Sequence, residues 1–135
     1  MENVSLVILY CDMRGFARMA VALGSRMPAF VQEFYEAMGE EIPARWGIHF
    51  DCDLEVSVSA GPVTRGLFGH RSLRTLDVMG ETVNEAAVLT RCRGVAVTGP
   101  VNAALGDAFR TEPLPDVPLK WRDEPLRAWR VLEGS

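Results

Sequence analysis

The feature that most constrains this chain is an apolar run near its start, Val4 to Cys11, which only Ser5 interrupts. The run is short and rich in residues that favour β-structure, so it predicts a strand buried in the centre of a sheet. Asp12 ends the run, and Gly15 permits a tight turn before apolar residues begin to recur at helical spacing. The chain is therefore expected to start with a strand that leads directly into a helix.

Strand and helix signals are intermixed along the rest of the chain, which predicts an α+β fold, or α/β by a looser naming. Thr82 and Glu85 have the spacing of a capping box at a helix start, whereas Gly61 and Pro62 are typical of a turn. Further helices are expected over 16–23, 28–42, 82–93 and 100–109, and strands over 47–50, 54–60, 63–69, 76–79 and 95–97, with a closing hairpin of 119–121 and 126–132.

Length and charge limit the possible functions. The 135 residues fit a single domain, 1–135, and the net charge of −4 argues against binding to nucleic acid or to an anionic membrane. No apolar stretch approaches the roughly 20 residues that cross a bilayer. The three cysteines have no metal-ligand spacing, which indicates a reducing, cytoplasmic setting.

Three separated stretches resemble the class III adenylate/guanylate (nucleotidyl) cyclase domains. They are the strand and turn of 6–16, the glycine-marked strands and helix start of 56–87, and the closing segment of 113–132. The second is the most specific, since its Gly80, Thr82, Val83 and Asn84 stand at the family's spacing. The resemblance implies a ferredoxin-like βαββαβ core with added strands, paired head-to-tail so that sites form between subunits.

The resemblance also implies a chemistry and a set of residues. The family cyclises a nucleoside triphosphate such as ATP or GTP with two divalent metal ions, Mg²⁺ or Mn²⁺, and the protein mainly positions groups and neutralises charge. Residues that match the family's functional positions are Asp12 and Met13 for metal, Asn84 for catalysis through the ribose, and Gly15, Phe16, Asp77 and Lys120 for the nucleotide.

Each of these polar residues also has a purely structural interpretation, which stays open. Asp12 has the residue type of a helix N-cap, and Asp77 that of a strand-end carboxylate. Asn84 could bond to the backbone of an early helical turn. Lys120, like the neighbouring Arg122, could belong to a solvated sheet edge that discourages strand pairing.

The sequence departs from the family at catalytic positions. Val88 stands where the family has a phosphate-stabilising Arg, and Arg91 lies on roughly the opposite side of the helix at about 100° per residue. A hairpin and a helix that precede the 54–60 strand in the family are missing, together with a metal aspartate and an adenine-reading Lys. Asp51 and Asp53 stand in that place, where turn chemistry explains them.

Three functional hypotheses follow from these departures. The first is a catalytically impaired cyclase-homology module with a regulatory, nucleotide-sensing or partner-binding role. The alternative is an active cyclase that makes a 3′,5′-cyclic nucleotide and pyrophosphate. The third is a scaffold that keeps the cyclase-like pattern but has no nucleotide site. The missing hairpin should also expose one edge of the Val4–Cys11 strand, and this predicts a homodimer, or a heterodimer with another cyclase-like or signalling chain, paired along that edge.

Overall fold

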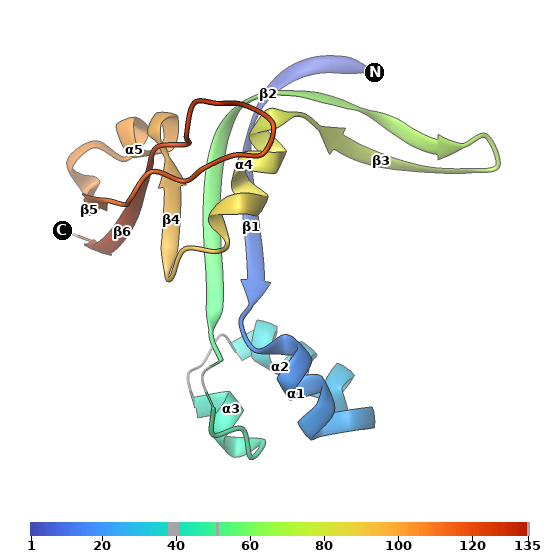
Figure 1. Cartoon of the computed structure of the whole chain (residues 1–135). Coiled ribbons are helices and arrows are strands. Elements are labelled where there is room, and N and C mark those ends of the chain that lie inside the picture. The colour runs from blue at the N-terminus through green and yellow to red at the C-terminus, as the bar shows by residue number, and fades with distance from the viewer. Residues whose placement is uncertain (38–40, 51, 135) are drawn as a thin grey trace. The chain divides into compact units, whose positions relative to one another are not determined.

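The computed structural model describes residues 1–37, 41–50 and 52–134 of the chain (Figure 1). The chain forms two compact units, one of Met1–Cys11 with Glu55–Ser135 and one of Asp12–Leu54. Both boundaries fall at strands, because the chain leaves the first unit at the end of its first strand and returns at the start of its second. That the whole chain acts as one domain stays a prediction.

The larger unit is built on a six-stranded sheet, in which five strands follow the order β1-β2-β4-β6-β5 and β3 pairs with β2. The mixture of this sheet with helices confirms the predicted α+β class. The strands are β1 (Glu2–Met13), β2 (Leu54–His70), β3 (Leu73–Met79), β4 (Val95–Thr98), β5 (Phe109–Pro113) and β6 (Ala128–Gly134).

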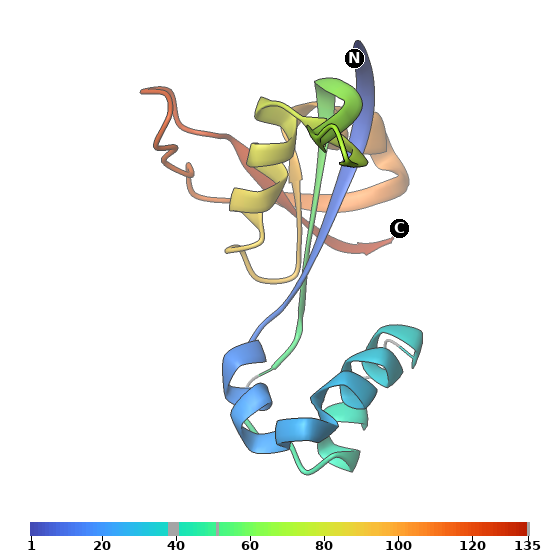
Figure 2. The same cartoon turned by 90° about the vertical axis from the view of Figure 1, so that its right-hand side faces the viewer.

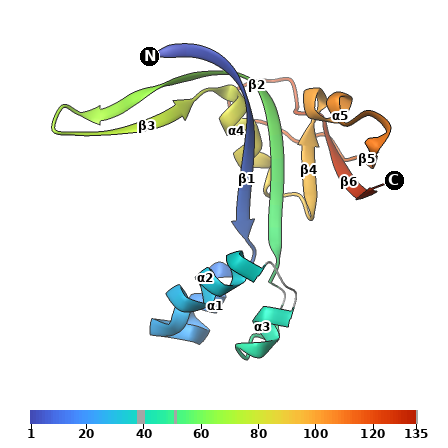
Figure 3. The ribbon, with the colours of Figure 1, turned by 180° about the vertical axis from the view of Figure 1, so that it is seen from behind.

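The register of the sheet brings distant segments together. β2 runs parallel to β4, with Val56 beside Val95, and β4 runs antiparallel to β6. The second half of β2 forms a long antiparallel hairpin with β3, from Thr64 opposite Met79 to His70 opposite Leu73. This hairpin extends away from β4, β5 and β6 (Figure 3) and is called the arm below.

Helix α4 (Glu81–Leu89) lies on one face of this sheet (Figure 2). Small side chains let the two surfaces approach closely: Ser57 and Ser59 of β2 and Ala86 of α4 are all fully buried, and the Ser57 hydroxyl donates to the Ala86 carbonyl. A buried cluster of Leu89, Ala96, Leu126 and Ala128 continues this core, and the short helix α5 (Gly99–Leu105) follows β4.

The smaller unit is helical and has a core of its own. Gly15 takes a left-handed conformation (φ 77°) at the start of α1 (Phe16–Leu23), as the predicted tight turn requires. A short 3₁₀ turn (Gly24–Arg26), α2 (Met27–Ala37) and α3 (Glu41–Arg45) follow. The buried side chains of this core are Met13, Met19, Leu23, Met27, Phe30, Phe34, Ile42 and Ile48.

The first strand is present but is not central. β1 stands at one end of the strand order, and Val7 and Leu9 are 69% and 63% exposed. The expectation of an exposed edge is therefore confirmed, and that of a buried central strand is wrong. Among residues 46–50 and 52–53 there is no strand or helix between α3 and β2, so the predicted 47–50 strand is wrong, whereas the missing hairpin and helix agree with the structure.

Several local predictions are wrong for identifiable reasons. Gly61 and Pro62 do not turn the chain, since β2 continues through them. The helix expected over 28–42 does not end before Pro43, since this proline lies inside α3, near its start, where a proline is tolerated. The closing hairpin pairs β6 with β5, and the predicted 119–121 strand is replaced by a loop in which Val117 forms a bridge with Leu126.

Candidate functional site

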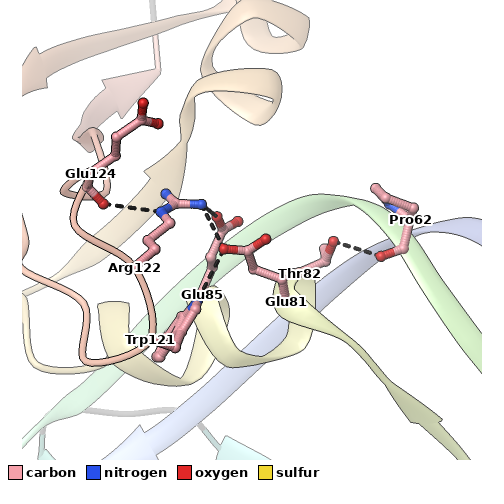
Figure 4. Close-up of polar contacts among 7 residues, drawn as sticks. All are labelled: Pro62, Glu81, Thr82, Glu85, Trp121, Arg122 and Glu124. Atoms are coloured by element: carbon pink, nitrogen blue, oxygen red, sulfur yellow. Dashed lines mark hydrogen bonds and ion pairs between the residues drawn. The ribbon is translucent and has the colours of Figure 1, made fainter.

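The start of α4 follows a turn at Gly80 and is fixed to β2 by a side-chain hydrogen bond. Gly80, which links β3 to α4, has φ 149°, a value that favours glycine. The Thr82 hydroxyl donates to the carbonyl of Pro62 at 2.9 Å (Figure 4), so it does not cap its own helix. The predicted capping box is therefore wrong, because both of its side chains bond elsewhere.

A charged cluster joins the α4 start to the loop before β6, as Figure 4 shows. Arg122 Nη1 lies 2.7 Å from Glu81 Oε1 and 3.2 Å from Glu85 Oε1. Its Nε donates to the carbonyl of Glu124 at 3.0 Å, and the Trp121 indole donates to Glu81 Oε1 at 3.0 Å. One guanidinium thus serves two carboxylates one helical turn apart, and the cluster carries a net charge of −1.

The pKa values of the two carboxylates of this cluster are shifted in opposite directions. The hydrogen bond from Trp121 lowers the pKa of Glu81, and the positive charge of Arg122 lowers it further. Burial raises the pKa of Glu85 above its ordinary value, although Arg122 opposes this. Arg122 therefore favours the ionised form of both glutamates, and for Glu85 it does so against the effect of burial.

Three of the predicted site residues lie in this larger unit and are exposed. Asn84 is on α4, one helical turn after Gly80, and its backbone N–H donates to the Gly80 carbonyl at 3.2 Å. Asp77 lies on β3 opposite Gly66, and its Oδ1 accepts from the Val78 N–H at 2.8 Å. Lys120 directly precedes Trp121 in the loop. Their assignment to nucleotide and catalysis stays a prediction.

The other predicted residues belong to the helical unit. Asp12 is exposed, and its Oδ1 accepts from the Met13 N–H at 3.0 Å. The Met13 side chain is buried in the helical core, so only its backbone is left to face a ligand. Gly15 forms the turn, and Phe16 is 50% exposed. A metal or nucleotide role for these residues also stays a prediction.

The helical unit joins Asp53 to the turn that follows Asp12. The Arg14 N–H donates to the Asp53 carbonyl at 2.7 Å, which joins the turn after β1 to the residue before β2. Asp53 Oδ1 accepts from the Leu54 N–H at 2.7 Å, and Asp51 lies outside the described residues. Within neither unit do three or more His, Cys, Asp or Glu side chains of the described residues gather as a metal site.

Sequence reasoning missed the cluster around Arg122, although a signal was present. Glu81 and Glu85 are four residues apart and share one side of a helix, where two like charges repel unless a cation lies between them. The sequence does not say which cation, because Arg122 is 37 residues from Glu85. The interpretation of Arg122 as a solvated edge residue is wrong.

Comparison of the structure with solved structures gives a consistent answer. The adenylyl cyclase CyaB from P. aeruginosa matches with a TM-score of 0.85 and 14% identity over 98% of this chain and 97% of that one. The guanylate cyclase domain of RhGC from Catenaria anguillulae, in complex with GTP, matches with a TM-score of 0.78 and 14% identity over 100% of both chains.

This chain has the class III nucleotidyl cyclase fold. The dimeric guanylyl cyclase domain of RhoGC from Blastocladiella emersonii shares it, with a TM-score of 0.74 and 14% identity over 100% of both chains. No family model matches the sequence, and no curated protein matches it. The predicted cyclase-homology fold is thus confirmed, in a chain whose sequence is 14% identical to each of these three proteins.

No helix among the described residues is long and apolar enough to cross a membrane.

Proposed function

We propose that this chain is a cytoplasmic cyclase-homology module that does not cyclise nucleotides alone and acts as a regulatory, nucleotide-sensing or partner-binding domain. The observation that carries the proposal is that Arg122 is paired with two glutamates of α4. Position 88 of α4 holds a half-buried Val where the resemblance expects a phosphate-binding Arg, and Arg122, which reaches the same helix, is held by Glu81 and Glu85.

Charge decides what this arrangement can do. A transferring phosphoryl group needs positive charge around it, and the Arg122 cluster carries a net −1. Removal of one preorganised electrostatic donor typically costs about 10²–10³ in rate. The chain lacks an Arg at 88 and, between α3 and β2, the family segment that holds a metal aspartate and a base-reading Lys. Its activity should therefore be far below that of a complete site.

The direct test is to incubate the purified chain with ATP or GTP and Mg²⁺ or Mn²⁺ and to search for cyclic nucleotide by mass spectrometry. We expect no more product than from the Asp12→Ala variant, which is the matched control. Product that is absent from the control preparation would overturn the proposal. Calorimetric titration of each nucleotide then separates a sensing module from a partner-binding module.

A second candidate function, an active cyclase, is favoured by one observation in the helical unit. The Arg14–Asp53 backbone hydrogen bond joins a second acidic residue, Asp53, to the turn that follows Asp12, and Mg²⁺ sites commonly use one or two carboxylates together with substrate phosphates. Asp12 and Asp53 would then hold a divalent ion that neutralises phosphate charge. This hypothesis predicts metal-dependent product that Asp53→Asn and Asp12→Asn both abolish.

Partners are part of the proposal, because groups missing from one chain can come from another. The guanylyl cyclase domain from Blastocladiella emersonii is described as dimeric. We propose that this chain likewise acts as a homodimer or as a heterodimer with another cyclase-like or signalling chain. Mixing with a catalytically complete cyclase domain and measuring its rate would test the heterodimer.

A further inference from the structure

The outer edge of β1 is open. β1 stands first in the strand order and its one neighbour in that order is β2 (Figure 3). Side chains at the start of β1 hold one edge against β2. Thr64 donates to Asn3 at 3.0 Å, and Arg65 donates to Glu2 at 2.8 Å. In the part of the chain that the structure describes, no strand pairs with the other edge.

This edge differs from the other free edges of the same sheet. β5 carries Arg110, Glu112 and Pro113, and β3 carries Arg74 and Asp77, which are the charges and proline that usually protect an edge from unwanted pairing. From Asn3 to Cys11, β1 has no charge, proline or glycine. The sheet is thus protected at two edges and unprotected at the third.

The unprotected edge also exposes apolar side chains. Val7 is 69% exposed, Leu9 63% and Tyr10 42%, although all three lie in a regular strand. An uncharged strand with unpaired backbone groups and exposed aliphatic side chains is a template for another strand of the same character. A charged segment placed there would lose solvation without gaining a partner for its charge.

We propose that β1 pairs with β1 of a second copy of this chain, antiparallel and about a two-fold axis. The second copy supplies an uncharged β-forming strand of matching length. Charge sets the register. A two-fold axis at Val7 would place Glu2 opposite the partner's Asp12, and like charges directly opposite destabilise a strand pair.

An axis at Ile8 avoids this repulsion. It places Val7 opposite the partner's Leu9, so the two most exposed aliphatic side chains of the segment cover each other on both sides of the axis. It also places Ser5 opposite the partner's Cys11. Residues directly opposite in an antiparallel pair point to the same face, so these pairings keep the faces of both sheets continuous. This surface needs no nucleotide; it rests on the homodimer named in the proposed function and names its interface, whereas the proposed loss of cyclisation does not depend on it.

Mass measurement in solution tests the surface. By light scattering the chain should have twice its 14.9 kDa mass, and Val7→Lys should be a monomer with an unchanged circular dichroism spectrum. Leu73→Lys is the matched control, since Leu73 is an apolar residue, 77% exposed, at the tip of the arm. A monomeric parent chain, a dimer that survives Val7→Lys, or a dimer that only Leu73→Lys dissolves would each overturn the proposal.

Cross-linking tests the register. Opposed residues in an antiparallel pair have Cα atoms about 4.5–5.5 Å apart, within the range of a disulfide. Under mild oxidation, Ser5→Cys should form a covalent dimer with the native Cys11, which is a free thiol. Adding Cys11→Ser to that variant should abolish the cross-link, and Asn3→Cys should form none. Absence of the Ser5→Cys cross-link in a chain that is dimeric by mass would overturn the register at Ile8.

Discussion

At the scale of single residues, Arg122 ties the loop before β6 to helix α4. Arg122→Ala removes the cation shared by Glu81 and Glu85 and leaves Glu85, whose pKa burial already raises, without a counter-charge. Because the site is partly exposed, we expect a loss of about 1 kcal/mol in the free energy of unfolding, measured in urea. Arg91→Ala, at an exposed position near the end of the same helix, should change it by less than about 0.5 kcal/mol.

The two glutamates should respond to pH with opposite signs. The lowered pKa of Glu81 adds stability above the ordinary glutamate pKa, and this is lost as pH falls through the lowered value. The raised pKa of Glu85 adds stability below the ordinary value, and this is lost as pH rises through the raised one.

As pH rises from about 3 to about 7, the stability of the Glu81→Gln variant should therefore fall relative to that of the parent chain. Over the same rise, the stability of the Glu85→Gln variant should increase relative to that of the parent chain. Urea unfolding at a series of pH values measures both. Shifts of the same sign in the two variants would contradict the assignment.

How far the site could be predicted depends on the range of the interactions. The Asp12–Gly15 turn and the Gly80–Asn84 helix start are local patterns, and the chain places them where the sequence indicates. The Arg122 cluster joins residues 37 and 41 positions apart, so the helical spacing of Glu81 and Glu85 could show that a cation was needed but not which one. Val88 was recognisable as a departure because one helix holds both it and Asn84.

At the scale of elements, the packing of α4 on β2 depends on small side chains. Ala86 and Ser57 are each fully buried, and the Ser57 hydroxyl reaches the Ala86 carbonyl. Ala86→Leu would force the helix off the sheet, and we expect a loss of about 1–3 kcal/mol in thermal or urea unfolding. Asn84→Leu adds similar volume on the exposed side of α4 and should be nearly neutral in stability. Equal losses of stability in the two variants would mean that the contact between α4 and β2 is not tightly packed at Ala86.

Elements were predictable where local pattern and tertiary position agree. The apolar run at the start is a strand, and the helix from Phe16 to Leu23 ends before Gly24 as expected. The pattern failed where long-range pairing overrides local preference. Gly61 and Pro62 remain in β2 because the arm continues the strand, and β6 takes β5 as its partner instead of the nearer 119–121 segment.

Burial of the first strand could not be read from its composition. An apolar strand usually has neighbours on both edges, and here the hairpin that would cover one edge is missing. The same run thus predicts a strand correctly and its central place wrongly. The contradiction is resolved at the level of the assembly if a second copy covers the edge.

At the scale of the whole molecule, the described residues include one buried cluster in each of the two units. One consists of residues between Met13 and Ile48, and the other is centred on Leu89 and Leu126. No residue is shared between these clusters, and the chain passes from one unit to the other at the end of β1 and at the start of β2. A protein with this organisation is expected to open in parts before it unfolds completely.

Phe30→Ala tests this organisation. Phe30 is fully buried in the helical core, where its ring lies 5.7 Å from that of Phe34 and 5.8 Å from that of Trp46. The cavity should cost about 3–5 kcal/mol, enough to open the helical unit in a chain of ordinary stability. In hydrogen exchange, amides of α1 and α2 should then lose protection while those of α4 and β4 keep it. Leu89→Ala is the reciprocal control and should first expose α4 and β4. Loss of protection throughout the chain in both variants would show instead that the two clusters unfold as one cooperative unit.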